Sequence, residues 1–214
     1  MNKLIELDQQ LLLAINGAHA PWADTFFWWL SSPWTWLPVY FLLIGLLFWQ
    51  FGWRKAIWMT LALIIAVGLS DYVSSGIIKQ LVCRPRPTHE PALAGLVHLV
   101  NGYTGGQYGF VSSHAANTIC VATLFSLLWQ QKNNHGWWLL IYVALNCYSR
   151  MYLGAHYPGD IIGGLIVGAL MALAAYAVLR LAGVAEARHR GDDAEAMDHK
   201  QSGDDADGHP QDGL

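Results

Sequence analysis

A histidine and a carboxylate stand one helical turn apart in this chain. His156 is followed by Asp160 four residues later, and Pro158 between them suits the first turn of a helix. At this spacing Asp160 could hold one imidazole nitrogen and leave the other free to attack, because a weak nucleophile needs an orienting partner. A second histidine, His114, opens another apolar segment. The pattern indicates group transfer through a histidine.

Basic residues with anion-binding chemistry accompany the histidines: Lys79, Arg86 and Arg150. An arginine fork pairs with two phosphate oxygens at once, and a lysine supplies a point charge. Ser112 and Ser113 stand where a helix would begin, so backbone N–H groups and the helix dipole there favour a bound anion. Together these residues predict a phosphate site.

The elements that must position this site are apolar segments suited to a bilayer. Of the 214 residues, 54% are hydrophobic and 13% are charged, about half the ~25% charged residues of a soluble domain. A bilayer core needs about 20 mostly apolar residues per helix, and tryptophans gather at the ends of such segments here. We therefore expect an all-α integral membrane bundle of about five transmembrane helices. The segments are 34–51, 56–82, 114–129, 137–153 and 158–181.

Two further segments complete the predicted organisation. The first residues form an amphipathic pattern that predicts an N-terminal helix in the membrane interface. Its apolar residues on one helical face are Leu4, Ile5, Leu11, Leu12 and Ile15. The last segment, 186–214, carries nine acids against three bases, a net charge of −6. Such a composition predicts a disordered tail, which leaves 1–185 as the membrane domain.

The charge pattern also predicts an orientation. With five spans, most loop Lys and Arg residues fall on one side, which the positive-inside rule makes cytoplasmic, and the tail lies on that side too. The basic group Lys79, Arg84, Arg86 and Arg150 falls on the other side, against that bias. Anion binding is a reason to keep it there. If the chain is bacterial, the site faces the periplasm from the inner membrane.

Three segments of the chain, 79–87, 110–115 and 149–160, contain these candidate residues. They resemble the signatures of the type 2 phosphatidic acid phosphatase superfamily, which includes acid phosphatases and vanadium haloperoxidases. The resemblance covers roughly residues 55 to 180. The first signature is complete at Lys79, Arg86 and Pro87. The third is complete at Ser149, Arg150, His156 and Asp160. The second departs from its P-S-G-H pattern: Ser112 and His114 match, whereas Val111 and Ser113 replace proline and glycine.

The resemblance implies a role for each matching residue. His156 would attack phosphorus and form a phosphohistidine, oriented by Asp160. His114 would protonate the departing lipid oxygen and then activate water. The positive charges would neutralise the phosphoryl oxygens, which suits a reaction that depends mostly on positioning and charge stabilisation. Ser113 adds bulk beside the phosphate. No residue cluster resembles a divalent-metal site, so neither a metal nor another cofactor is expected.

For three polar residues near the signatures, the sequence allows two interpretations each. Arg84 would contact either the substrate head group or the lipid surface. Glu90 lies in a glycine-containing loop, which is either a connector or a lid that recognises the head group. Asp71 lies inside an apolar segment, where ionisable residues are functional candidates. A structural hydrogen bond that orients its helix is favoured over direct catalysis.

The substrate is left open among lipid phosphates. A carrier-lipid diphosphate, undecaprenyl diphosphate, is favoured because the chain has no large extra domain for a sugar head group. The enzymatic alternatives are a lipid A phosphatase and a phosphatidylglycerophosphate phosphatase. A non-catalytic transporter or scaffold is the alternative from another class; nucleic acid is not an expected partner, and protein partners stay undetermined.

Overall fold

The regular secondary structure of the described residues is helical. The computed structural model describes residues 3–129 and 136–185, so the predicted acidic tail lies outside the described residues. The principal helices are α1 Lys3–Gly17, α2 Pro21–Leu30, α3 Pro33–Asp71, α4 Lys79–Val82, α5 Ser113–Trp129, α6 Leu139–Tyr152 and α7 Pro158–Leu181. A π-helical segment, Tyr72–Ile78, joins α3 to α4, and short 3₁₀ turns lie at Pro87–His89, Pro91–Leu93, Val100–Gly102 and Gly136–Trp138. The all-α prediction is confirmed.

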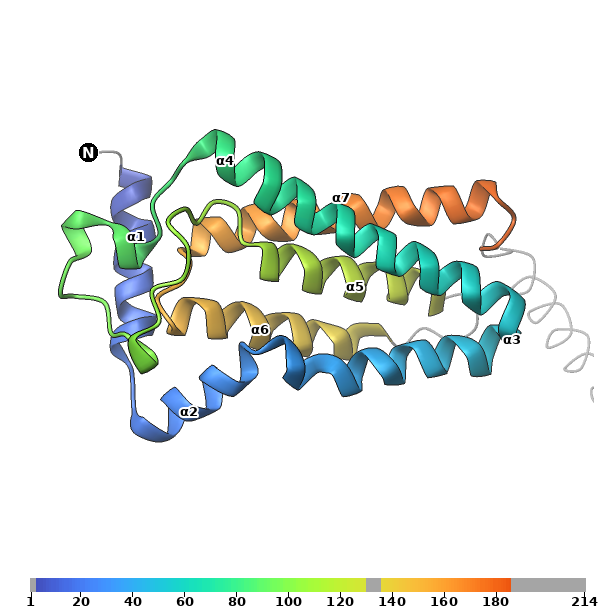
Figure 1. The fold of residues 1–214 in the computed structure, drawn as a ribbon, viewed down its shortest axis with the longest axis horizontal. Helices are drawn as coiled ribbons and strands as arrows, with labels where there is room; N and C mark the ends of the chain where they lie inside the picture. The colour runs from blue at the N-terminus through green and yellow to red at the C-terminus, as the bar shows by residue number, and fades with distance from the viewer. Residues whose placement is uncertain (1–2, 130–135, 186–214) are drawn as a thin grey trace, which may run out of the picture.

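Helix α3 folds back on itself at Gly52. The φ angle of Gly52 is +71°, in the left-handed region that glycine enters without steric cost. The first limb of α3 runs away from the end that holds the chain's N-terminus, and the second limb returns through the π-helical segment to α4 (Figure 1). The two limbs correspond to the first two segments predicted from the sequence.

The predicted number of membrane spans is only partly supported. Two helical stretches within the described residues are long and apolar enough to cross a bilayer, Pro33–Val82 and Pro158–Leu181. The first of them contains the turn at Gly52. Helices α5 and α6 have 17 and 14 residues, fewer than the roughly 20 that a perpendicular span needs. The count of five spans therefore stays a prediction.

Helix α5 packs closely against α7. A Cβ atom on Gly164 would lie 2.4 Å from the carbonyl oxygen of Ser112, and one on Gly168 would lie 1.9 Å from that of Ala116. Either contact is far inside van der Waals distance, so these glycines allow the two backbones to approach. The packing fixes the first turns of α5 and α7 beside each other.

Helix α1 crosses one end of the bundle (Figure 1). Asn16, which is fully buried, holds it there. The Asn16 amide donates to the carbonyl oxygens of Tyr152 at 2.7 Å and His98 at 3.0 Å, and its side-chain oxygen accepts from the His98 N–H at 2.7 Å. Leu4 and Leu11 are exposed whereas Leu12 is buried, so the helix offers only part of its apolar surface to the surroundings. Its place in the membrane interface stays a prediction.

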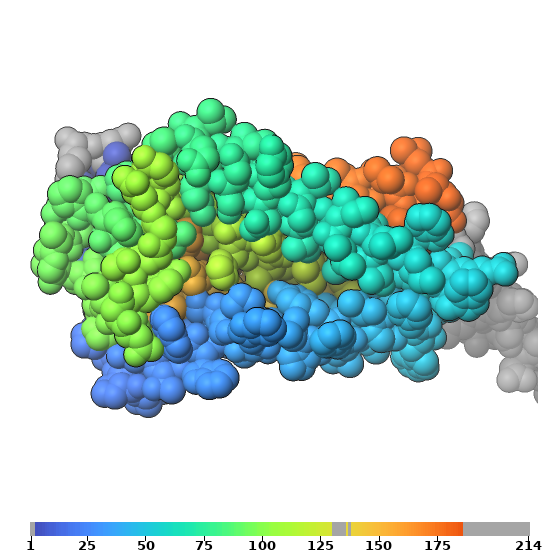
Figure 2. All heavy atoms as spheres, in the orientation of Figure 1, coloured from blue at the N-terminus to red at the C-terminus, as the bar shows by residue number. Residues whose placement is uncertain are grey.

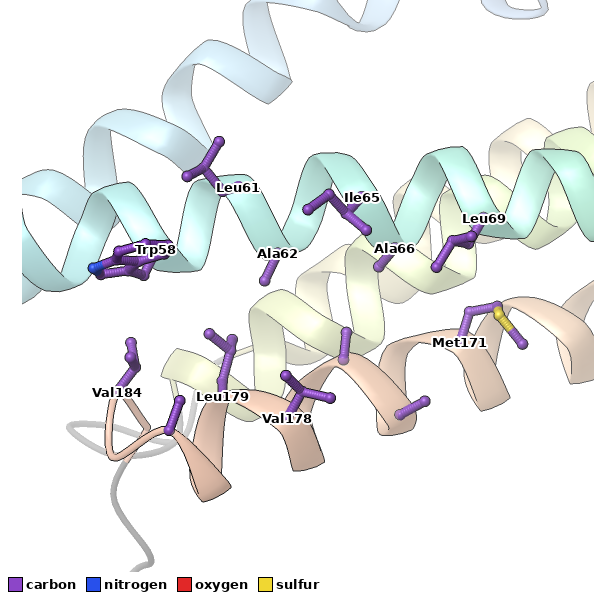
Figure 3. A pocket seen from close by; sticks show the side chains of 13 residues that line it. Trp58, Leu61, Ala62, Ile65, Ala66, Leu69, Met171, Val178, Leu179 and Val184 are labelled. Carbon is purple, nitrogen blue, oxygen red and sulfur yellow. The ribbon is translucent and has the colours of Figure 1, made fainter.

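An apolar groove of about 690 Å³ separates the second limb of α3 from the last turns of α7. Figure 3 shows Trp58 and Leu69 on one wall and Met171 and Val178 on the other. None of the predicted site residues lines this groove. The polar chemistry is confined to the opposite end of the bundle.

Candidate active site

The candidate active site forms where distant segments of the chain meet at one end of the bundle. Each predicted residue stands at the end of a helix or in the loop beside it: Lys79 at the start of α4, Arg86 in the following loop, Ser113 and His114 at the start of α5, Arg150 near the end of α6, His156 in the next loop and Asp160 in the first turn of α7. The charges of Arg150, Arg86 and Lys79 all act on both histidines. The structure therefore brings the three signatures together.

His156 and Asp160 form a buried pair. The exposed fractions of their side chains are 1% and 0%, and His156 Nδ1 lies 3.5 Å from Asp160 Oδ2. The same carboxylate oxygen accepts the Tyr157 N–H at 3.0 Å and thereby caps α7. Within the described part of the chain, neither ring nitrogen of His156 has a hydrogen-bond partner. Because Nδ1 faces the carboxylate, Nε2 is the nitrogen left for chemistry.

Burial and neighbouring cations keep His156 neutral. Burial, followed by the charges of Arg150, Arg86 and Lys79, lowers the pKa of this imidazole well below its ordinary value of 6.5. A neutral imidazole has a lone pair available near pH 7. The same surroundings that suit a phosphate anion thus also suit a histidine nucleophile.

The three cations are buried, and the two arginines among them are incompletely paired. Arg150 donates to the Ser31 hydroxyl and, at 2.8 Å, to the Tyr103 hydroxyl. Arg86 donates from Nε to the Tyr108 carbonyl oxygen at 3.0 Å. Arg86 Nη1 and Arg150 Nε are buried without a hydrogen-bond partner among the described residues. Buried donors left unpaired are costly, so the site is prepared for an anion with several acceptor oxygens.

Arg84 is committed to two carboxylates. Its guanidinium lies 2.9 Å from Asp160 Oδ1 and 2.6 Å from Asp8 Oδ2, and it stacks over the Tyr157 ring at 4.0 Å. Asp8 Oδ1 in turn accepts the Gly159 N–H at 2.8 Å. Contact with a head group or the lipid surface, as predicted, would compete with these pairings. The observed contacts place Arg84 behind Asp160, as its support.

Two residues of this region were missed by sequence reasoning. Asp8 connects α1 to the site through Arg84, and the only sequence signal was an acid within an amphipathic helix. Tyr103 comes from the loop between α4 and α5 and contacts Arg150. Burial raises the pKa of the Tyr103 hydroxyl, but the guanidinium groups of Arg150 and Arg86 outweigh burial and lower it overall. The position of Asp8 beside Arg84 depends on how α1 packs on the bundle, and the position of Tyr103 depends on the path of the loop.

The loop that carries Tyr103 approaches the site through glycines. A Cβ atom on Gly109 would lie 2.8 Å from Asp160 Oδ2, and one on Gly105 would lie 2.5 Å from Arg86 Nη1. Glu90, in the same loop, accepts the Ala92 N–H at 3.4 Å and caps a 3₁₀ turn. The loop lies over that end of the bundle (Figure 2), and the choice between a connector and a lid stays open. Recognition of a head group by Glu90 stays a prediction.

The two serines of the second signature occupy different positions. Ser112 is fully buried: its hydroxyl accepts the Ala115 N–H at 3.4 Å, and its own N–H donates to the Asp160 carbonyl oxygen at 2.9 Å. It therefore ties the start of α5 to α7. Ser113 instead lines a cavity together with His114. The added bulk of Ser113 thus faces that cavity.

His114 lies between two cavities. One, of about 310 Å³, is lined by Arg150 and Tyr103, and the other, of about 260 Å³, is lined by Asp71 and Asn117. Asp71 accepts a hydrogen bond from the Asn117 amide at 3.1 Å, an interhelical contact of the kind favoured from the sequence. Within the described residues, no group of three or more His, Cys, Asp or Glu side chains is placed to hold a metal ion.

Two histidines, an orienting carboxylate and three buried cations meet at one end of a helical bundle, an arrangement typical of a phosphoryl-transfer enzyme. The family model described as the PAP2 superfamily matches residues 55–183. The chain belongs to this superfamily and is a phosphatase. The transporter or scaffold alternative is therefore set aside.

Relatives and a solved structure agree with this assignment. The chain is 36% identical to a lipid A 4'-phosphatase of Bacteroides thetaiotaomicron, over 77% of this chain and 73% of that protein. It is 35% identical to a lipid A 4'-phosphatase of Porphyromonas gingivalis, over 83% and 75%. A crystal structure of a transmembrane PAP2-type phosphatidylglycerolphosphate phosphatase from Bacillus subtilis has a TM-score of 0.62 at 20% identity, over 83% of this chain and 87% of that one, which shows the common fold.

A carrier-lipid phosphatase is a weaker match. The undecaprenyl-diphosphatase BcrC of Bacillus subtilis is 30% identical over 49% of this chain and 50% of that protein. The preference for undecaprenyl diphosphate that was drawn from the sequence is therefore not supported. The alternative, a lipid A phosphatase, agrees better with the relatives.

Proposed function

We propose that this protein removes a phosphate group from the sugar of a lipid A-type molecule through a phosphohistidine on His156. The chemistry rests on one observation above all: the buried imidazole of His156 lies 3.5 Å from the Asp160 carboxylate, and burial with the charges of three cations lowers its pKa well below 6.5. The substrate class rests on the similarity to the two lipid A 4'-phosphatases.

The first step transfers the phosphoryl group to the enzyme. His156 Nε2 attacks phosphorus, the P–N bond forms, and the bond from phosphorus to the sugar oxygen breaks with its electron pair left on that oxygen. His114, which the negative charge of the bound phosphate would keep protonated beside the three cations, gives this oxygen a proton, so that an alcohol leaves. The charge on the imidazole of His156 is stabilised by Asp160 at 3.5 Å, a separation that a small shift on substrate binding would shorten to a hydrogen bond.

The second step returns the enzyme to its starting state. His114, now neutral, takes a proton from water, and the oxygen attacks phosphorus as the P–N bond breaks. Inorganic phosphate leaves and His156 regains its lone pair. Lys79, Arg86 and Arg150 neutralise the phosphoryl oxygens in both steps, as electrostatic stabilisation of phosphoryl transfer requires. None of these steps needs a metal ion.

Phosphate release by detergent-purified protein tests this proposal. We expect turnover of lipid A in EDTA, and loss of it in the His156→Ala variant. Undecaprenyl diphosphate and phosphatidylglycerophosphate are assayed in parallel. Faster turnover of either of them would replace the proposed substrate, and dependence on a divalent ion would remove the metal-free mechanism. Equal activity of the variant would remove His156 as nucleophile.

We also propose that the site faces the periplasm of a bacterial inner membrane. The positive-inside rule supports this orientation, because the basic residues of the site lie opposite the other loop cations. A reporter fused after residue 214 is then cytoplasmic. Alkaline phosphatase activity of such a fusion in intact cells would contradict both the orientation and the count of five spans.

A further inference from the structure

Several polar side chains on the long helices have no role in the proposed chemistry. Asp71, Asn117 and Asn146 come from three different helices and line the cavity of about 260 Å³ beside His114. Polar groups are costly within a membrane and are usually buried against one another or around a function. Figure 2 shows that the molecule is hollowed between the two limbs of α3, with α5 at the floor of the hollow.

The two asparagines that line this cavity have side-chain oxygens without a hydrogen-bond donor among the described residues. Asn146 is 3% exposed, yet its side-chain oxygen has no hydrogen-bond partner among the described residues. The side-chain oxygen of Asn117 is likewise buried and unpartnered, although its amide nitrogen donates to Asp71. That hydrogen bond fixes which end of the Asn117 amide points toward Asp71. Both acceptors therefore lack a donor in the part of the chain that the structure describes.

The position of His114 indicates which part of a substrate reaches this cavity. His114 lines both the cavity with Asn117 and Asn146 and the one with Arg150 and Tyr103. In the proposed mechanism the phosphate lies on the Arg150 side and His114 protonates the leaving oxygen. The group attached to that oxygen must then continue past His114, into the cavity lined by the two asparagines.

The size and polarity of the cavity fit one sugar ring. Its volume of about 260 Å³ lies just under the ~300–1,000 Å³ of pockets that enclose drug-sized molecules. A sugar offers hydroxyl and amide donors to the asparagine oxygens. A prenyl or acyl chain offers no donor, and would leave both oxygens unpaired.

We propose that Asn117 and Asn146, with Asp71 as the residue that orients Asn117, form the subsite for the sugar that carries the phosphate. This inference rests on the proposed function and extends it to named specificity residues. A substrate with an apolar or a small leaving group gains nothing from these contacts. The subsite thus makes this enzyme selective for phosphate on a sugar.

The test compares two substrates in one set of variants. Asn146→Leu and Asn117→Leu keep the approximate side-chain size and remove the acceptors. The ratio of kcat/KM for lipid A to that for phosphatidic acid, which has no sugar, should fall about tenfold in each variant, mainly through KM, as expected for lost hydrogen bonds to a buried substrate. Thr60→Val is the matched control: it removes a buried hydroxyl without a partner in the described structure, but outside the cavity, and should leave the ratio as in the wild type.

The outcomes separate the subsite from the proposed function. If the wild type hydrolyses lipid A and the ratio stays the same in both asparagine variants, the subsite is wrong while the function stands. An equal loss on both substrates would also overturn it, because a general packing defect does not discriminate between head groups. If the wild type hydrolyses phosphatidic acid but not lipid A, the proposed function and the subsite both fail.

Discussion

His156 and His114 carry the same side chain in different surroundings. His156 is 1% exposed, and its Nδ1 lies 3.5 Å from Asp160 in the first turn of α7. His114 is half-buried and lines two cavities. The first setting fixes an imidazole in one orientation and keeps it neutral, as a nucleophile requires. The second leaves the imidazole of His114 accessible to a substrate bound in the cavities, as a general acid for the leaving group must be.

The largest expected effects separate the roles of these histidines. His156→Ala should lower kcat for lipid A by at least about 10⁴-fold, as loss of a catalytic nucleophile does. His114→Ala should cost about 10²–10⁴-fold, the range for a general acid. With p-nitrophenyl phosphate, whose leaving group needs no proton, the His114 variant should still form the phosphoenzyme and accumulate it. Quenching in alkaline SDS, in which the P–N bond of phosphohistidine survives, traps the labelled phosphoenzyme and measures this, and trapping in the His156 variant instead would reverse the two assignments.

Asp160→Asn should have the next largest effect. It keeps an acceptor for the Tyr157 N–H but removes the charge beside His156 Nδ1, and neutralising the equivalent carboxylate of serine-protease triads costs about 10⁴-fold. We expect a loss of about 10²–10⁴-fold in the rate of phosphoenzyme formation. Asp24→Asn is the control, because Asp24 pairs with His98 at 3.0 Å at the same end of the molecule. Comparable losses in both variants would show that Asp160 acts only through stability.

Much of the site could be predicted because its parts lie at the ends of apolar segments. Alternating spans bring Lys79, His114 and His156 to the same end of a bundle, whatever the details of packing. The relation of His156 to Asp160 follows from the geometry of one helical turn. The turn at Gly52 also falls within the predicted break between the first two segments. Local periodicity and topology were sufficient for these features.

The missed features depend on contacts that no periodicity records. Asp8 meets Arg84 across 76 positions of sequence only because α1 lies across the end of the bundle. Tyr103 reaches Arg150 because Gly105 and Gly109 allow the loop to approach closely. The preference for undecaprenyl diphosphate was drawn from the lack of an extra domain, whereas polar residues within the bundle line a cavity large enough for a sugar.

The pH dependence of stability sharpens the contrast for His156. Its pKa in the folded protein is lowered well below the ordinary 6.5, so below about pH 6.5 the unfolded chain binds a proton that the folded protein does not. Stability therefore rises with pH and is lost on acidification, by up to about 1.4 kcal/mol per pH unit below 6.5 until the folded pKa is reached. The melting temperature in detergent, measured from pH 7.5 to 5, should fall less steeply for His156→Gln. The same slope in both proteins would place the titration elsewhere.

The smallest effect should come from Asp8, which contacts His156 only indirectly, through Arg84 and Asp160. Asp8→Asn leaves an acceptor for the Gly159 N–H but removes one of the two charges that hold Arg84. Because Arg84 is only partly buried, with 24% of its side chain exposed, we expect a three- to tenfold loss in phosphoenzyme formation, about 0.7–1.4 kcal/mol. Asp8→Glu should recover part of the rate. Glu6→Gln removes the same charge from the same helix and serves as control; if it matched Asp8→Asn, the loss would come from the net charge of α1, and Arg84 would orient Asp160 without help from that helix.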